Sequence, residues 1–113
     1  MTPLLEHPRR LEPTAEKTFY FGQGRVNVLF ETEPVACGLF TLEKDAVGSL
    51  DVHERAVELL WVLRGTLEYQ VGQDRFVADA GSGLAIPPRH PHTVRNVGEG
   101  EAQVFWAFVP NDH

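Results

Sequence analysis

The sequence has little cysteine, a deficit of positive charge and no long hydrophobic segment. Its single cysteine, Cys37, excludes an intrachain disulfide and any metal site built from several thiolates. The 16 acidic residues outnumber the 10 lysines and arginines, giving a formal net charge of −6, which argues against nucleic acid or an anionic membrane as a partner. No apolar run could cross a bilayer, and residues 1–17 lack the apolar stretch of a secretory signal. We therefore expect a cytoplasmic protein.

Amphipathic helical periodicity is also missing. From Thr18 onward the chain instead consists of short runs rich in Val, Phe, Leu, Tyr and Trp, separated by turns that contain glycine or proline. Many short strands at close spacing are typical of an antiparallel sandwich or barrel, so the pattern predicts an all-β fold. The expected strands are residues 18–21, 25–31, 35–43, 57–64, 66–71, 75–79, 83–87, 92–96 and 102–110.

A chain of 113 residues suits one domain with a single core. Residues 1–17 hold three prolines and scattered charge, and we interpret them as an extended N-terminal arm before a domain at 18–113. The expected strand 57–64 is apolar at nearly every position, so both of its faces should be covered. If Glu58 points into the barrel, Trp61 and Leu63 point outward. An outward Trp and Leu need a second surface, which predicts a homodimer.

Two segments have the spacings of a known family. Gly81, Pro87, His92 and Asn96 are separated by five, four and three residues. Here the chain resembles the cupins, whose second motif is Gly, five residues, Pro, one residue, Gly, two residues, His, three residues, Asn. Arg89 stands where that motif has its second glycine. The resemblance covers roughly residues 45–109 and implies a single-domain, antiparallel jelly-roll β-barrel.

The first cupin motif is Gly, five residues, His, one residue, His, three or four residues, Glu, six residues, Gly. Glu58 and Gly65 match its end, but one of its histidines is missing. With a four-residue gap before Glu58, His53 takes the second histidine position and Asp51 takes the first. Alternatively, His53 takes the first position and Arg55 the second, but the gap to Glu58 is then one residue too short. We prefer the alignment of Asp51 and His53 because it keeps every spacing.

The resemblance implies a metal site inside the barrel, held by His53, Glu58 and His92, with Asp51 as a candidate fourth ligand. Two imidazoles and one carboxylate leave coordination positions open for O₂ or substrate, and they suit several ions. The expected cofactor is therefore one divalent transition metal, Fe, Mn, Ni or Zn, and the expected partner is a small organic molecule.

Further residues are expected around the metal. Leu60, Val62 and Val94 share strand parity with the ligands and should line an apolar pocket, together with aromatic residues of the last strand. His90 is a candidate general acid or base at the rim. Arg89 is a candidate clamp for a substrate carboxylate.

Three interpretations of function stay open. The first is a metal-dependent enzyme, either a dioxygenase or an isomerase or lyase. The second is a non-catalytic cupin that binds a small ligand, which the loss of one histidine favours. The third is a metal-free structural barrel in which Glu58 pairs with Arg89 or Arg95. The fold does not choose among them, because this family carries many functions.

Overall fold

The computed structural model describes residues 6–14, 17–32 and 35–111, and the remainder of the predicted arm lies outside these ranges. The described part of the arm, 6–14, has neither helix nor strand, and the division at residue 17 stays a prediction. Nine strands follow, and each predicted strand is present with its ends shifted by one residue at most. They are β1 (Thr18–Phe21), β2 (Gly24–Thr32), β3 (Val35–Leu42), β4 (Ala56–Arg64), β5 (Thr66–Val71), β6 (Asp74–Asp79), β7 (Gly83–Ile86), β8 (His92–Asn96) and β9 (Ala102–Pro110).

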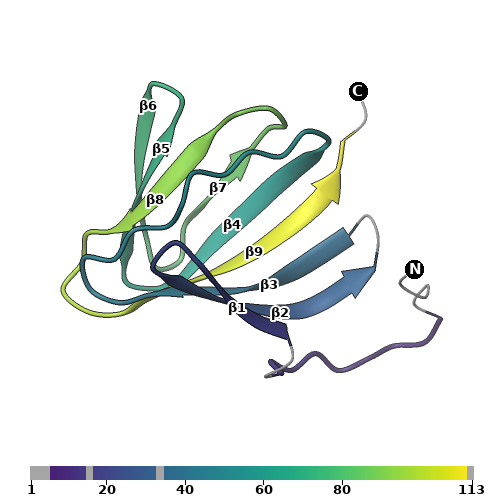
Figure 1. The fold of residues 1–113 in the computed structure, drawn as a ribbon. Helices are drawn as coiled ribbons and strands as arrows, with labels where there is room; N and C mark the ends of the chain where they lie inside the picture. The colour runs from purple at the N-terminus through teal and green to yellow at the C-terminus, as the bar shows by residue number, and fades with distance from the viewer. Residues whose placement is uncertain (1–5, 15–16, 33–34, 112–113) are drawn as a thin grey trace.

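The strands form two antiparallel sheets that face each other (Figure 1). The larger sheet has the order β1-β2-β3-β9-β4-β7, and the smaller has the order β6-β5-β8. Strands distant in sequence thus lie side by side, as β3 does with β9 and β5 with β8. The arrangement is that of a jelly roll, and it confirms the predicted all-β class.

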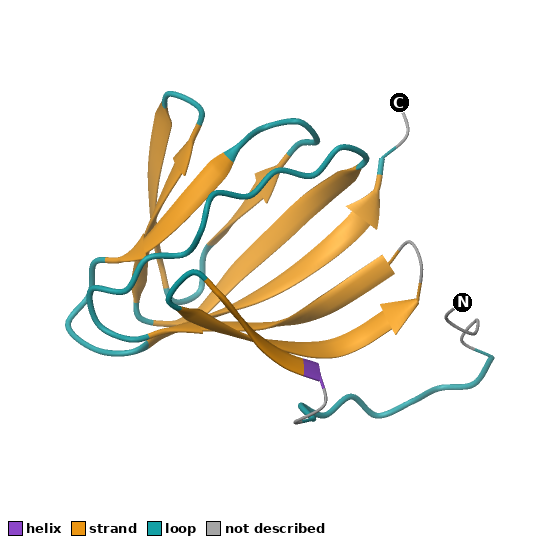
Figure 2. Ribbon diagram, viewed as in Figure 1, coloured by secondary structure: helices purple, strands orange, loops and turns teal. Residues whose placement is uncertain are grey.

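The segment between β3 and β4 runs beside β8 as a loop (Figure 2). Isolated bridges join Val47 to Arg95 and Asp51 to His92. The Asp51 and His92 backbones exchange two hydrogen bonds, both of 2.9 Å. This pairing brings the loop that carries the first motif against the strand that carries the second.

Strand β4 is two-sided in the way its sequence predicts. Glu58, Leu60 and Val62 are buried, whereas Trp61 and Leu63 are about half exposed, at 52% and 47%. Alternate residues of a strand point to opposite faces, so Glu58 enters the barrel and Trp61 leaves it. The surface expected to cover Trp61 and Leu63 is not part of this single chain, and the homodimer stays a prediction.

One end of the barrel is filled and the other holds the polar groups. Among the described residues, the largest side chains exposed by less than 2% are Leu42, Leu67, Val62, Val104 and Asn96. Strand pairings place them at one level, since Leu67 is opposite Asn96 and Val62 is opposite Val104. Further along the same strands, Glu58 is opposite Phe108 and His92 begins β8. The apolar core therefore closes the barrel below the site.

Among the described residues, no helix is long and apolar enough to cross a membrane.

Candidate metal centre

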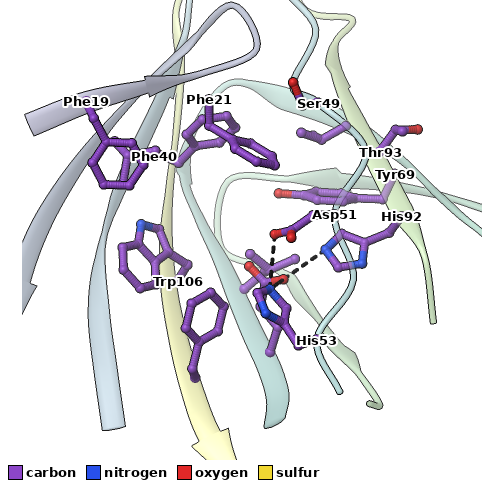
Figure 3. Close-up of a pocket in the computed structure, with 15 residues that line it drawn as sticks. Phe19, Phe21, Phe40, Ser49, Asp51, His53, Tyr69, His92, Thr93 and Trp106 are labelled. Atoms are coloured by element: carbon purple, nitrogen blue, oxygen red, sulfur yellow. Dashed lines mark hydrogen bonds and ion pairs between the residues drawn. The ribbon is translucent and has the colours of Figure 1, made fainter. Parts of the chain in front are cut away.

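Four side chains meet inside the open half of the barrel. Asp51 and His53 come from the loop before β4, Glu58 from β4 and His92 from the first position of β8. One potential ligand atom from each, an imidazole nitrogen or a carboxylate oxygen, lies within 4.8 Å of the other three (Figure 3). The structure thus brings together all four residues predicted as ligands, although their binding of a metal stays a prediction.

Glu58 lies at the centre of the polar contacts. Its Oε1 is 2.9 Å from His92 Nε2 and 3.5 Å from His53 Nε2. His53 Nε2 is also 3.0 Å from Asp51 Oδ2. Each histidine therefore turns its Nε2 atom toward the carboxylates. That nitrogen is the one that would bind a metal ion held between these side chains.

Backbone contacts fix the orientation of these side chains. His92 Nδ1 is 3.0 Å from the carbonyl oxygen of His90. A carbonyl only accepts hydrogen bonds, so Nδ1 carries the proton and donates it, which leaves Nε2 able to bind a metal. Asp51 Oδ1 accepts a 2.9 Å bond from the amide of Val52, and the His53 ring lies 4.2 Å from the Phe108 ring, centroid to centroid.

The two carboxylates and the two imidazoles shift one another's pKa values. The hydrogen bond to Asp51, followed by that to Glu58, raises the pKa of His53 to about 9. Burial acts to lower the pKa of His92, but its hydrogen bonds to Glu58 and to the His90 carbonyl, together with the charges of Glu58 and Asp51, outweigh burial and raise it. Burial likewise acts to raise the pKa of Glu58, but the two histidines hold it below its ordinary value. The hydrogen bond to His53 lowers the pKa of Asp51.

These shifts describe carboxylates that stay charged and are stabilised by positive charge. A divalent cation supplies the same stabilisation when it replaces the protons on the histidines. Two imidazole nitrogens with carboxylate oxygens are a donor set that transition metals accept. The residues present therefore fit the metal that the cupin resemblance implies.

The two candidate catalytic residues lie outside this group. Neither His90 nor Arg89 lines the cavity, and both are exposed. Arg89 supports the loop, since its amide donates to the His53 carbonyl at 2.6 Å and its Nη1 donates to the Glu54 carbonyl at 3.0 Å. His90 supplies the carbonyl that orients His92. The structure thus shows both residues in contacts that hold candidate ligands in place. A catalytic role for either residue stays a prediction.

Glu58 has histidines rather than an arginine as its partners in the described chain. Arg95, one of the arginines considered for that role, lies 3.6 Å from Glu68. Arg89 donates to a backbone carbonyl instead. The burial of Glu58 is thus balanced by imidazoles, which are themselves able to bind a metal.

All four glycine positions of the two cupin motifs have positive φ, although only two are glycine. Gly65 and Gly81 have φ of 85° and 88°, and Asp45 and Arg89, at the other two positions, have φ of 65° and 64°. Five residues separate Asp45 from Asp51, so Asp45 stands where the first motif has its first glycine. Among the described residues, these are the only non-glycine positions with positive φ. The backbone conformation of both motifs is therefore retained, with local strain at the two positions that are not glycine.

Replacing Arg89 with glycine should stabilise the protein. A left-handed conformation costs a residue with a Cβ about 1 kcal/mol more than glycine, and the exposed side-chain bond to Glu54 offsets only part of that gain. We expect Arg89→Gly to raise the free energy of unfolding by about 0.5–1 kcal/mol, measured by urea denaturation. Asp45→Gly is the matched comparison and should gain less, because aspartate tolerates this conformation better. Destabilisation by Arg89→Gly would show that the side chain, not the backbone, governs this turn.

A cavity of about 250 Å³ adjoins the four residues. Leu60 and Val94 line it as predicted, and so do Trp106 and Phe108 of the last strand. Val62 does not, which corrects the sequence-based expectation. It is only 1% exposed and belongs to the filled end of the barrel, two residues beyond Leu60 on the same face.

Several cavity residues were not anticipated from the sequence. Phe19 and Phe21 of β1 and Phe40 of β3 form a wall opposite the polar group, as Figure 3 shows. Tyr69 of β5 also lines the cavity. Strand parity could have identified Tyr69, because it shares a face with the core residue Leu67. No local signal could place β1 across from the ligands, since that depends on its pairing with β2 at the edge of the larger sheet.

A sequence model of the Cupin domain matches residues 38–108, which is more than half of the chain. The chain belongs to the cupin family. The match confirms the resemblance noted from the two motifs and includes all four residues of the polar group. No curated protein sequence matches this cupin.

Solved cupin structures share the fold. One is the cupin domain of Cnp3 from Schizosaccharomyces pombe, with TM-score 0.74, 17% identity and coverage of 82% of this chain and 65% of that chain. Another is a predicted oxalate decarboxylase from Thermotoga maritima, with TM-score 0.73, 15% identity and coverage of 88% and 93%. A third is recombinant oxalate oxidase in complex with glycolate, with TM-score 0.69, 23% identity and coverage of 79% and 52%. This cupin thus spans less than two thirds of the first and third chains, and at such identities the likeness shows the fold alone.

Proposed function

We propose that this cupin binds one divalent transition metal and acts on a small organic molecule inside the barrel, with dioxygenase or isomerase and lyase chemistry. The supporting observation is the convergence of Asp51, His53, Glu58 and His92 at the wall of an apolar cavity. Fe, Mn, Ni and Zn all accept such a donor set. Catalytic and non-catalytic cupins share this fold, so the proposal depends on the site rather than on the barrel.

The residues of the chain have distinct parts in this proposal. A metal held there supplies a Lewis acid and, if redox-active, a centre for O₂ chemistry. His92 presents Nε2 because its Nδ1 donates to a carbonyl, and buried Glu58 provides the carboxylate that faces both imidazoles. The apolar walls exclude water, which strengthens electrostatic interactions with any polar group of the substrate.

A second candidate is a non-catalytic cupin that binds a small ligand with a degenerate metal site. One observation favours it: Asp51 contacts His53 through Nε2, the nitrogen that a metal would need. Asp51 can thus hold His53 protonated instead of joining it as a ligand. Metal content separates the two candidates, and turnover tests the first directly.

We extend the proposal to the oligomeric state, the cellular location and the partners of the protein. The outer face of β4, with Leu59, Trp61 and Leu63 exposed by 44%, 52% and 47%, is apolar enough to bury against a second copy. A homodimer in the cytoplasm, without nucleic acid or membrane partners, is the form we propose. Oxalate is not the substrate we propose, because no lysine or arginine is among the residues that line the cavity.

Metal analysis of untagged protein tests the proposal. After incubation with Fe(II), Mn(II), Ni(II) or Zn(II) and removal of free ion, we expect about one metal per chain in the wild type. His53→Ala and His92→Ala should each lose it, since removing one of a small set of ligands lowers affinity by orders of magnitude. His90→Ala is the matched control, because His90 is exposed and outside the group, and should keep the metal.

No metal in the wild type under any of these conditions would overturn the enzyme proposal and leave the non-catalytic candidate. Metal that survives both ligand substitutions would place the ion elsewhere on the protein. Turnover of carbonyl and aromatic compounds by the wild type, lost in His92→Ala, would support the catalytic form.

A further inference from the structure

The cavity has one polar end and largely apolar walls. The polar end is the four-residue group, while the walls are mostly aromatic and aliphatic side chains of several strands, among them Phe21, Phe40, Leu60, Val94, Trp106 and Phe108. The hydroxyl-bearing residues Ser49 and Thr93 also line the cavity. In Figure 3 the labelled aromatic residues Phe19, Phe21, Phe40 and Trp106 face the labelled Asp51, His53 and His92 across this space. A molecule that reaches the polar end therefore has most of its remaining surface against apolar side chains.

Away from the two histidines of the polar end, the described residues that line the cavity offer no cationic side chain for a second charge on that molecule. The cavity lining includes neither lysine nor arginine. Arginines near the barrel have partners elsewhere: Arg95 lies near Glu68, Arg64 contacts Glu101, and Arg89 donates to the Glu54 carbonyl. Asp51 and Glu58 already supply two negative charges, enough to balance a divalent ion. A carboxylate placed among the aromatic walls would stay unpaired, which is a costly arrangement.

Tyr69 adds a hydrogen-bond donor beside the polar end. Its side chain is 3% exposed and lines the cavity, and its hydroxyl has no hydrogen bond within the described chain. Figure 3 shows this hydroxyl pointing into the space between the aromatic wall and Asp51. Burial, and then the charge of Glu58, raise the pKa of Tyr69, so it is a neutral phenol at physiological pH. Among the described residues, the buried side-chain donor without a partner is Trp106 Nε1, and the Tyr69 hydroxyl is instead open to the cavity that both residues line. A ligand atom in the cavity can therefore accept a hydrogen bond from Tyr69.

We propose that the cavity takes a small molecule with an uncharged, ring-sized apolar body and an oxygen at one end, which accepts a hydrogen bond from Tyr69. This inference rests on the proposed function and narrows its substrate class. Tyr69 is then a specificity-determining residue. Dicarboxylates and other anions charged at both ends are excluded by the apolar walls.

The size of the cavity agrees with this class. An apolar cavity of about 150 Å³ accommodates benzene, and pockets for drug-sized ligands begin at about 300 Å³. At about 250 Å³, this cavity has room for one ring with a few substituents. A nucleotide or an oligosaccharide would exceed it.

Titration of the full chain with four probes, followed by ¹⁵N NMR, tests the proposal. The protein has two tryptophans: Trp106 lines the cavity, and Trp61 is exposed on the outer face of β4. Their indole N–H signals, assigned with Trp61→Phe, report ligand in the cavity and provide an internal control. The probes are 4-methylphenol, toluene, terephthalate and oxalate, each titrated into metal-free and metal-loaded protein.

We expect 4-methylphenol to shift the Trp106 signal without moving the Trp61 signal. Terephthalate, which has a carboxylate at each end of the ring and so places one among the apolar walls in either orientation, should bind at least a hundredfold more weakly. Oxalate should leave the Trp106 signal unmoved. In Tyr69→Phe, 4-methylphenol should lose about fivefold in affinity, whereas toluene, which has no oxygen, should bind as to the wild type and so confirm that the variant is folded.

Oxalate or terephthalate binding as tightly as 4-methylphenol would overturn the proposal, as would a Trp106 signal that no ring compound moves. Equal loss of both ring probes in Tyr69→Phe would show that Tyr69 only shapes the wall. A failure of the proposed function would be seen in a different measurement, the uptake of metal. Ring binding in a protein that takes up no metal would support the ligand class and refute the metal enzyme, and metal uptake without ring binding would do the reverse.

Discussion

Asn96→Asp is expected to lower the free energy of unfolding by about 3–5 kcal/mol, more than any other single substitution considered for this cupin. Asn96 is 1% exposed. Its Nδ2 donates to the carbonyl oxygens of Leu42, Glu43 and Gly100 at 3.0, 3.1 and 2.8 Å. Its Oδ1 accepts from the Gly98 amide at 3.0 Å. One side chain thus joins β8 to the end of β3 and to the turn before β9.

Aspartate has the same shape but the opposite hydrogen-bonding character on one atom. The oxygen that replaces Nδ2 would face three carbonyl oxygens and carry negative charge without a cation nearby. A buried charge without a partner is far more costly than the lost hydrogen bonds alone. Asn96→Ala removes the donor without adding charge, and we expect a smaller loss of about 2–3 kcal/mol. The order of these two variants separates charge burial from the loss of hydrogen bonds.

Urea denaturation followed by tryptophan fluorescence measures both losses. Asn27→Asp is the matched control, because Asn27 is half-buried and its Nδ2 makes one hydrogen bond, to Thr18 Oγ1 at 2.7 Å. The Thr18 hydroxyl, which now donates to the Thr14 carbonyl at 3.0 Å at an exposed site, can turn its proton to the aspartate and leave that carbonyl to water. The control should therefore change by less than about 1 kcal/mol. If Asn96→Asp were no less stable than this control, the network would not hold the barrel together.

Asn96 also illustrates why the fold was predictable from sequence. Its place in the second motif, with Gly81, Pro87 and His92, indicated a jelly-roll cupin before any coordinates, and turn glycines marked the strand ends. The inward direction of Glu58 followed from simple alternation along β4. These are local properties, set by residue type and spacing.

The cavity walls could not be predicted in the same way. Val62 has the parity of a lining residue, yet it lies at the filled end, and its depth depends on the pairing with Val104 across two strands. Phe19 and Phe40 reach the cavity through the order of strands in the larger sheet. Parity gives the face on which a side chain lies, whereas its depth along the barrel depends on strand register between distant segments.

Arg89 and Asp45 show a limit of motif comparison as well. Each stands where the family has glycine, yet both adopt positive φ. The hydrogen bonds around the turn explain how this conformation persists. The Arg89 amide donates to the His53 carbonyl, so the second motif supports the backbone of a ligand in the first. A long-range contact of this kind leaves no trace in spacing.

The second large predicted effect is a response to pH. As the pH rises, the stability of the metal-free protein should fall and its affinity for the metal should rise. Asp51 and Glu58 raise the pKa of His53 from 6.5 to about 9. A group whose pKa is raised by folding contributes stability fully below its unfolded value and loses it as pH rises through the folded value. Stability of the chelator-treated protein should therefore fall between pH 6.5 and 9, by about 2–3 kcal/mol once solvent screening of this partly exposed pair is allowed for.

The two carboxylates determine the pH below which the metal-free protein loses stability. Folding lowers the pKa values of Asp51 and Glu58, so their contribution is present above their unfolded values of 3.8 and 4.5 and is lost as pH falls below them. These are the same contacts counted from the other partner, so the two losses do not add. The metal-free protein should be most stable between about pH 4.5 and 6.5, below the usual position of the maximum.

Metal affinity should rise over the range in which stability falls. Each histidine must lose a proton to bind the ion, so affinity increases about tenfold per pH unit for each proton displaced. From pH 6.5 to 8.5, His53 alone should give about a hundredfold gain, measured by competition between the protein and a coloured chelator for Ni(II). Denaturation across the same range supplies the stability profile. His53→Gln should flatten that profile, whereas His90→Gln, exposed and outside the group, should keep it. Stability and affinity that rose together would mean that the carboxylates do not hold the histidine protons, and that the four residues are arranged for the ion alone.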